Sequence, residues 1–142
     1  MQSDSSVLIN KYSNGCGHLC LNRPKALNAL NLEMLHQLRT TLNTWLHDTS
    51  VKWVLITGSG EKAFCAGGDV KAVVEALNSN NASFAREFFE VEYSMDASIH
   101  KYPKPIVVLG QGYTMGGGLG IFSGATARVL TMAWGMAWVW KS

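Results

Sequence analysis

The chain has little charge, little cysteine and little proline, and the first two shortages each exclude a class of function. Only 15% of its 142 residues are charged and the net charge is +2. Without a basic run, such a sequence does not predict nucleic-acid binding. Cys16, Cys20 and Cys65 are an odd number with no signal peptide before them, so we expect reduced thiols rather than a disulfide scaffold. Cys16 and Cys20 lack Cys or His partners at zinc spacing, and no metal site is predicted.

A targeting segment and a membrane span are also missing. Residues 1–6 contain no arginine and no apolar core, so neither a secretory nor a mitochondrial presequence is expected. Between Gly110 and Trp140 the only charged residue is Arg128, and this length would suffice to cross a membrane. Repeated glycines interrupt the periodicity of that stretch, and no membrane span is predicted.

What is present is the composition of one globular domain, with 47% hydrophobic residues. Apolar runs on either side of Asn14-Gly15 predict a β-hairpin, because Asn-Gly supplies the positive φ angles of a tight turn. Apolar periodicity predicts the remaining elements: strands at 51–57, 106–109 and 128–131, helices at 31–47, 70–77 and 84–99, and a short helix ending at Phe122. The order β-β-α-β-α-α-β-α-β predicts an α/β fold with a largely parallel sheet.

Two glycine-rich loops give the strongest functional signal. Ala66-Gly67-Gly68-Asp69 and Gly116-Gly117-Gly118 each come after an apolar strand and open a predicted helix. Such turns aim unpaired backbone N–H groups and the positive end of a helix dipole at one point. Two converging turns can stabilise the oxyanion of an acyl group. Taken singly, the first is equally well explained as a tight turn capped by Asp69, and the second as close helix–sheet packing. Neither matches a Walker loop or a dinucleotide-binding fingerprint.

Among the side chains, Glu92 has the most informative position. It lies beside the apolar face that Phe88 and Met95 mark on their helix. Its carboxylate is therefore buried with a raised pKa, points into a ligand cavity, or reaches water at the helix edge. Cys65 has no histidine placed as its base, so we expect a small buried thiol rather than a nucleophile. The four histidines form no ligand pair and are expected to be incidental.

Three motifs together resemble the enoyl-CoA hydratase/isomerase (crotonase) superfamily. They are LNRPKALNAL at 21–30, KAFCAGGDV at 62–70 and GYTMGGGLG at 112–120. The resemblance spans roughly residues 7–131 and is strongest to the 3-hydroxyisobutyryl-CoA hydrolase branch, which cleaves a branched hydroxyacyl-CoA thioester in valine breakdown. It implies the N-terminal part of the crotonase spiral of ββα units, a fold usually assembled into trimers or larger oligomers.

The resemblance also implies residue roles. The backbone N–H groups of Gly68 and Gly117 form an oxyanion hole for the thioester carbonyl, and Glu92 contacts the acyl hydroxyl end. The segments Gly68-Asp69-Val70-Lys71 and Lys25-Ala26-Leu27 border coenzyme A. Coenzyme A is part of the substrate, so no separate cofactor is expected, and the partner is an acyl-CoA rather than nucleic acid or membrane. The implied location is mitochondrial, with cytoplasm or peroxisome as alternatives.

The sequence departs from the family pattern after residue 131. The family continues with a Pro-Glu, a later Asp for acid–base chemistry and C-terminal helices that pack neighbouring subunits, whereas residues 132–142 contain no carboxylate. We therefore expect a truncated, partial crotonase-like domain over 7–131, a non-family tail over 132–142, and a thioester hydrolase with little or no activity in this form. One alternative is an enoyl-CoA hydratase or isomerase, although Leu119-Gly120-Ile121 offers no glutamate after the triple glycine. The other is a non-catalytic CoA-binding fragment.

Overall fold

The computed structural model describes residues 4–131 and 137–141, and its elements follow the predicted alternation of strands and helices. In chain order they are β1 (Val7–Lys11), β2 (Cys16–Leu21), the 3-10 turn η1 (Pro24–Ala26), α1 (Leu32–His47), β3 (Trp53–Gly58), β4 (Ala63–Cys65), α2 (Val70–Asn78), α3 (Ala82–His100), β5 (Ile106–Gln111), β6 (Tyr113–Thr114), α4 (Gly117–Gly124), β7 (Ala127–Thr131) and β8 (Ala137–Lys141). The expected α/β class is confirmed.

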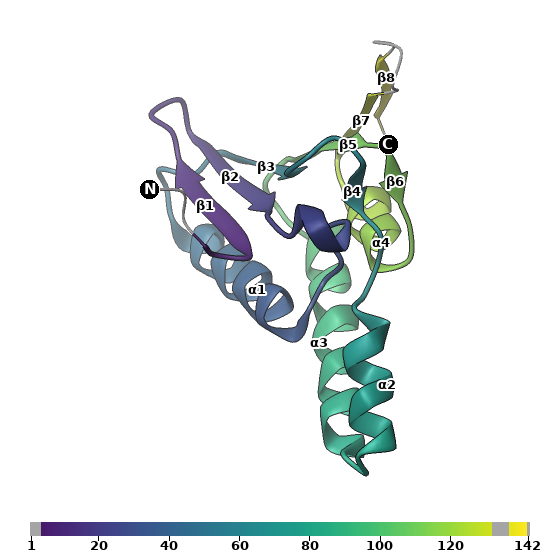
Figure 1. The fold of residues 1–142 in the computed structure, drawn as a ribbon. Coiled ribbons are helices and arrows are strands. Elements are labelled where there is room, and N and C mark those ends of the chain that lie inside the picture. The colour runs from purple at the N-terminus through teal and green to yellow at the C-terminus, as the bar shows by residue number, and fades with distance from the viewer. Residues whose placement is uncertain (1–3, 132–136, 142) are drawn as a thin grey trace.

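The main sheet has the strand order β1-β2-β3-β5-β7-β8. Its four inner strands are parallel, and β1 and β8 pair antiparallel at the two edges. Parallel neighbours need long crossover connections. Here α1 joins β2 to β3, the α2–α3 hairpin lies between β3 and β5, and α4 joins β5 to β7. Figure 1 shows α1 below the β1–β2 hairpin, while α2 and α3 run side by side away from the sheet.

The helices begin where side-chain caps allow them to begin. Asn31, Asp69 and Asn81 each accept a hydrogen bond from the backbone N–H three residues ahead, at 2.8, 3.5 and 3.3 Å. Such caps satisfy N–H groups that have no partner inside the helix. The predicted helices at 31–47 and 70–77 are confirmed, and α3 starts two residues before the predicted range.

Several short elements differ from the sequence prediction. Residues 63–65, expected to lie in a loop, form β4, which pairs in parallel with β6 in a second, two-stranded sheet. The hairpin turn is also different, since Gly15 has φ +85° but Asn14 does not have a positive φ. The chain reverses through a wider loop in which Tyr12 N–H donates to Cys16 O at 2.9 Å, so one positive φ is enough.

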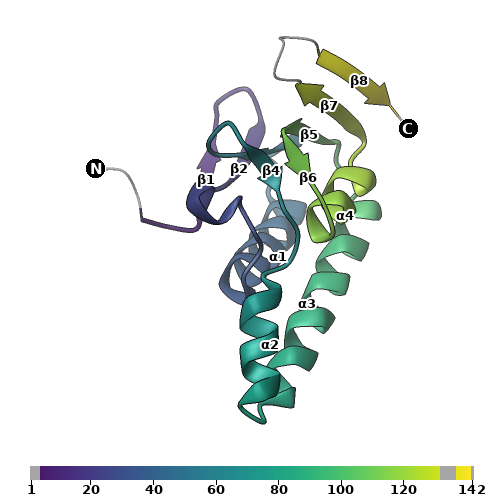
Figure 2. The same cartoon turned by 45° about the vertical axis from the view of Figure 1, so that its right-hand side comes forward.

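One hydrophobic core lies between the sheet and the helices. The apolar stripe predicted on α1 is buried, as is that on α3 apart from the half-buried Phe84, and each fully buried large side chain contributes about 1.5–3 kcal/mol relative to exposure. The buried stripe residues are Leu35, Leu38, Leu42, Phe88, Val91, Met95 and Ile99. Figure 2 shows α4 beside α3, close to β6. No helix within the described residues has the length and apolarity needed to cross a membrane.

The predicted tail falls partly outside the described residues, because residues 132–136 and 142 are not described. Residues 137–141 form β8, whose backbone pairs antiparallel with β7.

Candidate functional site

The two glycine-rich turns are in direct contact. A Cβ atom added to Gly67 would lie 3.1 Å from Met115 O, and one added to Gly116 would lie 3.4 Å from Gly67 Cα. Both glycines also have positive φ angles, +110° and +52°, which L side chains rarely adopt. The pairing of β4 with β6 fixes this contact, which we call the glycine junction (Gly67, Gly68, Gly116 and Gly117).

The amide of Gly68 is left free by the pairing around it. Leu30 forms an isolated parallel bridge with Gly68 in which Leu30 N–H donates to Gly67 O and Asp69 N–H donates to Leu30 O, both at 2.8 Å. These bonds use the neighbours of Gly68, so its own N–H points away from Leu30. Within the described residues this N–H has no acceptor, although buried N–H groups are normally paired.

The amide of Gly117 is free for a different reason. Gly117 begins α4, and a first-turn N–H has no acceptor inside its own helix. The next amides are satisfied, since Gly118 N–H donates to Met115 O at 2.9 Å and Gly120 N–H donates to Gly116 O at 3.1 Å. Gly117 N–H finds no acceptor in the described part of the chain. It also lies at the positive end of the helix dipole.

Glu92 faces both glycines from α3. A Cβ atom added to Gly68 would lie 3.2 Å from Glu92 Oε1, and one added to Gly117 would collide with the same oxygen. Burial raises the pKa of Glu92, and no hydrogen bond or charge from the described residues offsets this effect. The sequence allowed three environments for the Glu92 carboxylate. In the structure this carboxylate is half-buried, has a raised pKa and faces the glycine junction.

Apolar side chains and a buried thiol surround the junction. Phe88 ring atoms lie 3.1 Å from the Cβ position of Gly68, and Leu30 Cδ1 lies 3.3 Å from that of Gly117. Cys65 Sγ lies 3.0 Å from the Cβ position of Gly118. Burial raises the pKa of the Cys65 thiol to about 11, which favours the neutral buried thiol that the sequence predicts.

The segment 25–27 is joined to the turn that leads into 68–71. Ala66 N–H donates to Leu27 O at 3.0 Å, which fixes the two chain segments against each other. Lys25 and Lys71 are exposed, and Val70 is 63% exposed. A cleft of about 410 Å³ beside η1 is lined by Pro24, Lys25 and residues 59–63. The Asp69 carboxylate, by contrast, is occupied by the α2 cap and by Arg23.

Sequence reasoning assigned no role to Asn28, which organises this side of the site. Asn28 is fully buried at φ +54°. Its Nδ2 donates to Ser59 O and Ala63 O, each at 2.9 Å, and its Oδ1 accepts from Arg23 N–H at 2.9 Å. In the sequence, the sign of this role is the amide side chain of Asn28 within the otherwise apolar run ALNAL at 26–30. The sequence pattern predicts only a core position for Phe88 and gives no sign that Asp96, one turn after Glu92, belongs to the site.

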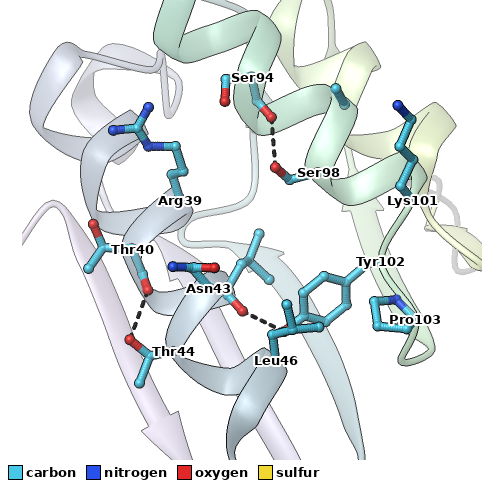
Figure 3. A pocket seen from close by; sticks show the side chains of 12 residues that line it. Arg39, Thr40, Asn43, Thr44, Leu46, Ser94, Ser98, Lys101, Tyr102 and Pro103 are labelled. Carbon is cyan, nitrogen blue, oxygen red and sulfur yellow. Dashed lines mark hydrogen bonds between the residues drawn. The ribbon is translucent and has the colours of Figure 1, made fainter.

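A larger cleft lies elsewhere, between α1 and the C-terminal half of α3. It has a volume of about 790 Å³ and contains none of the predicted site residues. Figure 3 shows its polar lining, with Arg39, Ser98 and Lys101 around Tyr102. The lining holds no carboxylate, histidine or cysteine, so we assign no chemistry to it.

The remaining cysteines and histidines have separate environments. The three cysteines are free thiols. His36 Nε2 lies 3.2 Å from Glu87 Oε1, and His18 Nε2 lies 2.8 Å from Thr57 Oγ1. His36 therefore has an ion-pair partner when protonated, which the sequence did not predict. In the described part of the chain, no three His, Cys, Asp or Glu side chains are grouped to hold a metal.

Comparison with known proteins gives a consistent set of similarities. A model of the enoyl-CoA hydratase/isomerase family matches residues 16–138. The Danio rerio protein named 3-hydroxyisobutyryl-CoA hydrolase, mitochondrial, is 44% identical over 130 residues, covering 92% of this chain and 34% of that protein. The Homo sapiens protein of the same name is 42% identical over 126 residues, covering 88% and 32%. The chain thus spans about a third of the length of these relatives.

Solved structures are similar over the same region. A carnitinyl-CoA dehydratase from Mycobacterium thermoresistibile matches with a TM-score of 0.85 and 42% identity, over 92% of this chain and 39% of that one. An enoyl-CoA hydratase from Rhodobacter sphaeroides matches with a TM-score of 0.82 and 39% identity, over 90% and 40%. The likeness therefore concerns sequence as well as fold.

Proposed function

The chain belongs to the enoyl-CoA hydratase/isomerase (crotonase) family, and from this premise we propose that it binds an acyl-CoA and polarises the thioester carbonyl. The carbonyl oxygen accepts hydrogen bonds from Gly68 N–H and Gly117 N–H. One observation carries the proposal: two glycines whose amides find no acceptor among the described residues belong to touching turns and face the same carboxylate oxygen. Removing one N–H donor from such an oxyanion hole lowers the reaction rate about 10²–10³-fold, so each of the two free N–H groups matters for the rate.

The substrate that we propose is 3-hydroxyisobutyryl-CoA or a close hydroxyacyl-CoA. Support comes from the relatives at 42–44% identity that carry this name. Glu92 would then hydrogen-bond the acyl hydroxyl, a role suited to a half-buried carboxylate that has a raised pKa and no hydrogen-bond partner among the described residues. The exposed Lys25 and Lys71 would attract the phosphates of coenzyme A. Ala26, Leu27, Val70 and the backbone of Asp69 complete that border.

Hydrolysis itself needs a group to activate water and a group to protonate the leaving thiolate. Residues 97–142 contain no Asp or Glu, and the carboxylates of α3 that face the glycines of α4 are Glu92 and Asp96. Since one acid–base group typically supplies about 10²–10⁴-fold of rate, we expect the 142-residue chain to bind and polarise acyl-CoA but to turn it over slowly. We propose 7–131 as the acyl-CoA-binding part and 132–142 as a tail that lacks the acid–base carboxylates, although the family model matches as far as residue 138.

Location and assembly are part of the same proposal. The relatives are named mitochondrial, and we propose that this chain acts there. We also expect less homo-oligomer formation than is usual in the family, and sedimentation of the purified chain tests this expectation.

A second candidate function is hydration of an enoyl-CoA. The two solved structures at 39% and 42% identity are an enoyl-CoA hydratase and a carnitinyl-CoA dehydratase, which favours it. Against it, Leu119, Gly120 and Ile121 follow the triple glycine without a glutamate. Conversion of an enoyl-CoA faster than hydrolysis of the hydroxyacyl-CoA would favour this alternative.

The decisive experiment measures polarisation directly rather than turnover. 3-Hydroxyisobutyryl-CoA, isotope-labelled at the thioester carbonyl, is added to the chain, and the carbonyl stretch is recorded by infrared difference spectroscopy. Two N–H donors withdraw electron density from the oxygen, so the bound carbonyl should absorb at lower frequency than the free one. In amide NMR spectra, Gly68 and Gly117 should shift with the thioester but not with coenzyme A alone.

The control is Ser123→Ala, at the far end of α4, which should leave the carbonyl frequency of the bound thioester unchanged. Calorimetry measures acyl-CoA and coenzyme A in parallel. Binding of both with an unshifted carbonyl would leave only a non-catalytic CoA-binding protein, and no binding of either would refute the proposal. Turnover at an ordinary rate of about 10 per second would contradict the expected inactivity.

A further inference from the structure

A second carboxylate, Asp96, lies one helical turn after Glu92 on the same face of α3. Residues four apart on a helix are neighbours on its surface. A Cβ atom on Gly117 would collide with Glu92 Oε1, and one on Gly120 would collide with Asp96 Oδ2, while Asp96 Oδ1 lies 2.9 Å from that Cβ position. Glycines on successive turns of α4 thus make room for two successive carboxylates of α3.

The Asp96 carboxylate has no partner that would explain its burial. Its Oδ1 is inaccessible to solvent and has no hydrogen-bond partner among the described residues. An unsatisfied buried carboxylate is costly unless it carries a proton. Burial, and secondly the charge of Glu92, raises the pKa of Asp96 to about 6.

Among the described residues, no cation on the elements packed against the pair, Arg39 of α1 included, is a cause of the pKa shift at either carboxylate. Helix α4 has no titratable side chain, and β4 offers only the neutral thiol of Cys65. On α3 itself, His100 lies one turn further on, against Gly124. On α1, His36 pairs with Glu87. On α2, the charged residues Lys71 and Glu75 do not contribute to the pKa shift of Glu92 or of Asp96.

We propose that Asp96 is a positioning residue that, below neutral pH, keeps one proton beside Glu92, so that the pair then carries at most one negative charge while an acyl-CoA occupies the glycine junction. The inference rests on the proposed function, because it matters only if the junction binds an acyl group. The bound carbonyl oxygen gains negative charge as it is polarised, and a second carboxylate charge one turn away would repel it. Acyl-group affinity should therefore fall as the pH rises and Asp96 loses its proton.

The first test measures this pH dependence on the full chain. The probe is a dethia analogue of 3-hydroxyisobutyryl-CoA, in which a methylene replaces the sulfur, so the carbonyl is kept and hydrolysis is prevented. Coenzyme A is titrated in parallel as a reference, because its phosphate monoester also changes its charge at about pH 6. The ratio of analogue affinity to coenzyme A affinity should fall about threefold to tenfold between about pH 5 and about pH 7.5.

Three variants separate a charge effect from a packing effect. Asp96→Asn keeps the shape but stays neutral, so its affinity ratio should be flat with pH. Asp96→Glu, the conservative variant, should retain the fall. Glu90→Gln removes an exposed carboxylate from the same helix and should match the parent chain. A pH-dependent ratio that persists in Asp96→Asn would overturn the inference.

The second test needs no ligand and so distinguishes failure of this inference from failure of the proposed function. The carboxyl carbon of Asp96 is followed by NMR during a pH titration of the unliganded chain. Glu92→Gln removes the neighbouring charge and should move the Asp96 midpoint to lower pH, whereas Glu90→Gln should not. An unmoved midpoint refutes the coupling of the two carboxylates. A moved midpoint in a chain that binds no analogue at any pH refutes the proposed function and, with it, the role assigned here.

Discussion

Arg23 and Asp69 form an ion pair between the two chain segments that border the glycine junction. Arg23 Nη2 lies 3.3 Å from Asp69 Oδ2, and the side chains are 26% and 21% exposed. The same guanidinium donates through Nη1 to Ala29 O at 2.7 Å. Because Asp69 also caps α2, one arginine joins the loop before α1 to the turn that carries Gly68.

Replacing Arg23 with Gln should loosen this connection. The variant leaves the Asp69 carboxylate and Ala29 O without their partner, and a loss of about 1–3 kcal/mol in the free energy of unfolding is expected. Acyl-CoA affinity should fall as well, because Gly68 belongs to the turn that Arg23 holds in place through Asp69. Urea unfolding and calorimetry measure the two effects, with Arg86→Gln, an exposed arginine of α3, as the control. Unchanged values for Arg23→Gln would show that the pair is not structural.

Local sequence patterns were sufficient for the elements whose physics is local. Apolar periodicity, and for α2 also the Asp69 cap, predicted α1 and α2 nearly to the residue. Strands β4 and β6 have three and two residues, too few to show a period of two. They are strands because they pair with each other, and the residues that pair are separated by about fifty positions. No local pattern encodes such a partner.

The same distinction holds at the candidate site. The glycine turns and Glu92 were visible because glycine and a carboxylate beside an apolar face are unusual in themselves. The importance of Asn28 depends on carbonyls of Ser59 and Ala63, 31 and 35 residues away. The situation of Asp96 depends on which residues of α4 happen to be glycine. Their roles were set by tertiary packing and had no signature of their own.

Asn28→Ala should be one of the most destabilising single changes in the chain. It removes the three hydrogen bonds of a fully buried side chain, takes a partner from two carbonyls and one N–H, and puts alanine at a φ of +54° that asparagine tolerates better. We expect a loss of about 2–4 kcal/mol in the free energy of unfolding. Chemical denaturation followed by circular dichroism measures it.

The matched control is Asn43→Ala, because Asn43 is exposed on α1. That variant should stay within about 0.5 kcal/mol of the parent chain. Equal stabilities of the two variants would mean that the Asn28 bonds contribute little.

Gly117→Ala tests the contact between Gly117 and Glu92. The new Cβ would collide with Glu92 Oε1, although alanine itself is favoured in a helix. The variant should therefore fold but bind 3-hydroxyisobutyryl-CoA at least about tenfold more weakly, which corresponds to about 1.4 kcal/mol. Calorimetry provides the affinities.

A double-mutant cycle identifies the cause. With Glu92→Ala as background, the collision is gone, so adding Gly117→Ala should change acyl-CoA affinity by less than about twofold. If the second change costs the same in both backgrounds, the effect of Gly117→Ala comes from elsewhere than Glu92.

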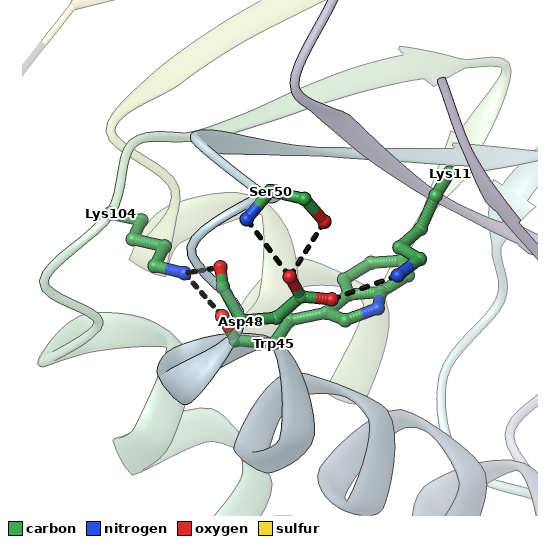
Figure 4. Close-up of polar contacts among 5 residues, drawn as sticks. All are labelled: Lys11, Trp45, Asp48, Ser50 and Lys104. Carbon is green, nitrogen blue, oxygen red and sulfur yellow. Dashed lines mark hydrogen bonds and ion pairs between the residues drawn. The ribbon is translucent and has the colours of Figure 1, made fainter. Parts of the chain in front are cut away.

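Asp48, at the end of α1, should make stability depend on acid pH. Figure 4 shows its carboxylate between Ser50 and Lys11. Oδ1 accepts from Ser50 Oγ at 2.6 Å and from Ser50 N–H at 2.9 Å, and Oδ2 lies 2.9 Å from Lys11 Nζ. The Ser50 hydroxyl first, and then Lys11, hold the pKa of Asp48 well below its ordinary value. Lys104 donates to Asp48 O at 2.8 Å and to Trp45 O, where a cation also suits the negative end of the helix dipole.

A carboxylate whose pKa is lowered by folding stabilises the native state because its ionised form is favoured there more than in the unfolded chain. Its contribution is therefore complete above the ordinary aspartate pKa of about 4 and is lost as the pH falls below it. Asp48→Asn should lower the melting temperature near about pH 7, and the difference from the parent chain should shrink on acidification. Ser50→Ala should weaken this pH dependence more than Lys11→Gln, because the hydroxyl is the larger cause. Glu75→Gln, on the exposed face of α2, serves as the control, and a melting-temperature difference for Asp48→Asn that is constant with pH would contradict the assignment.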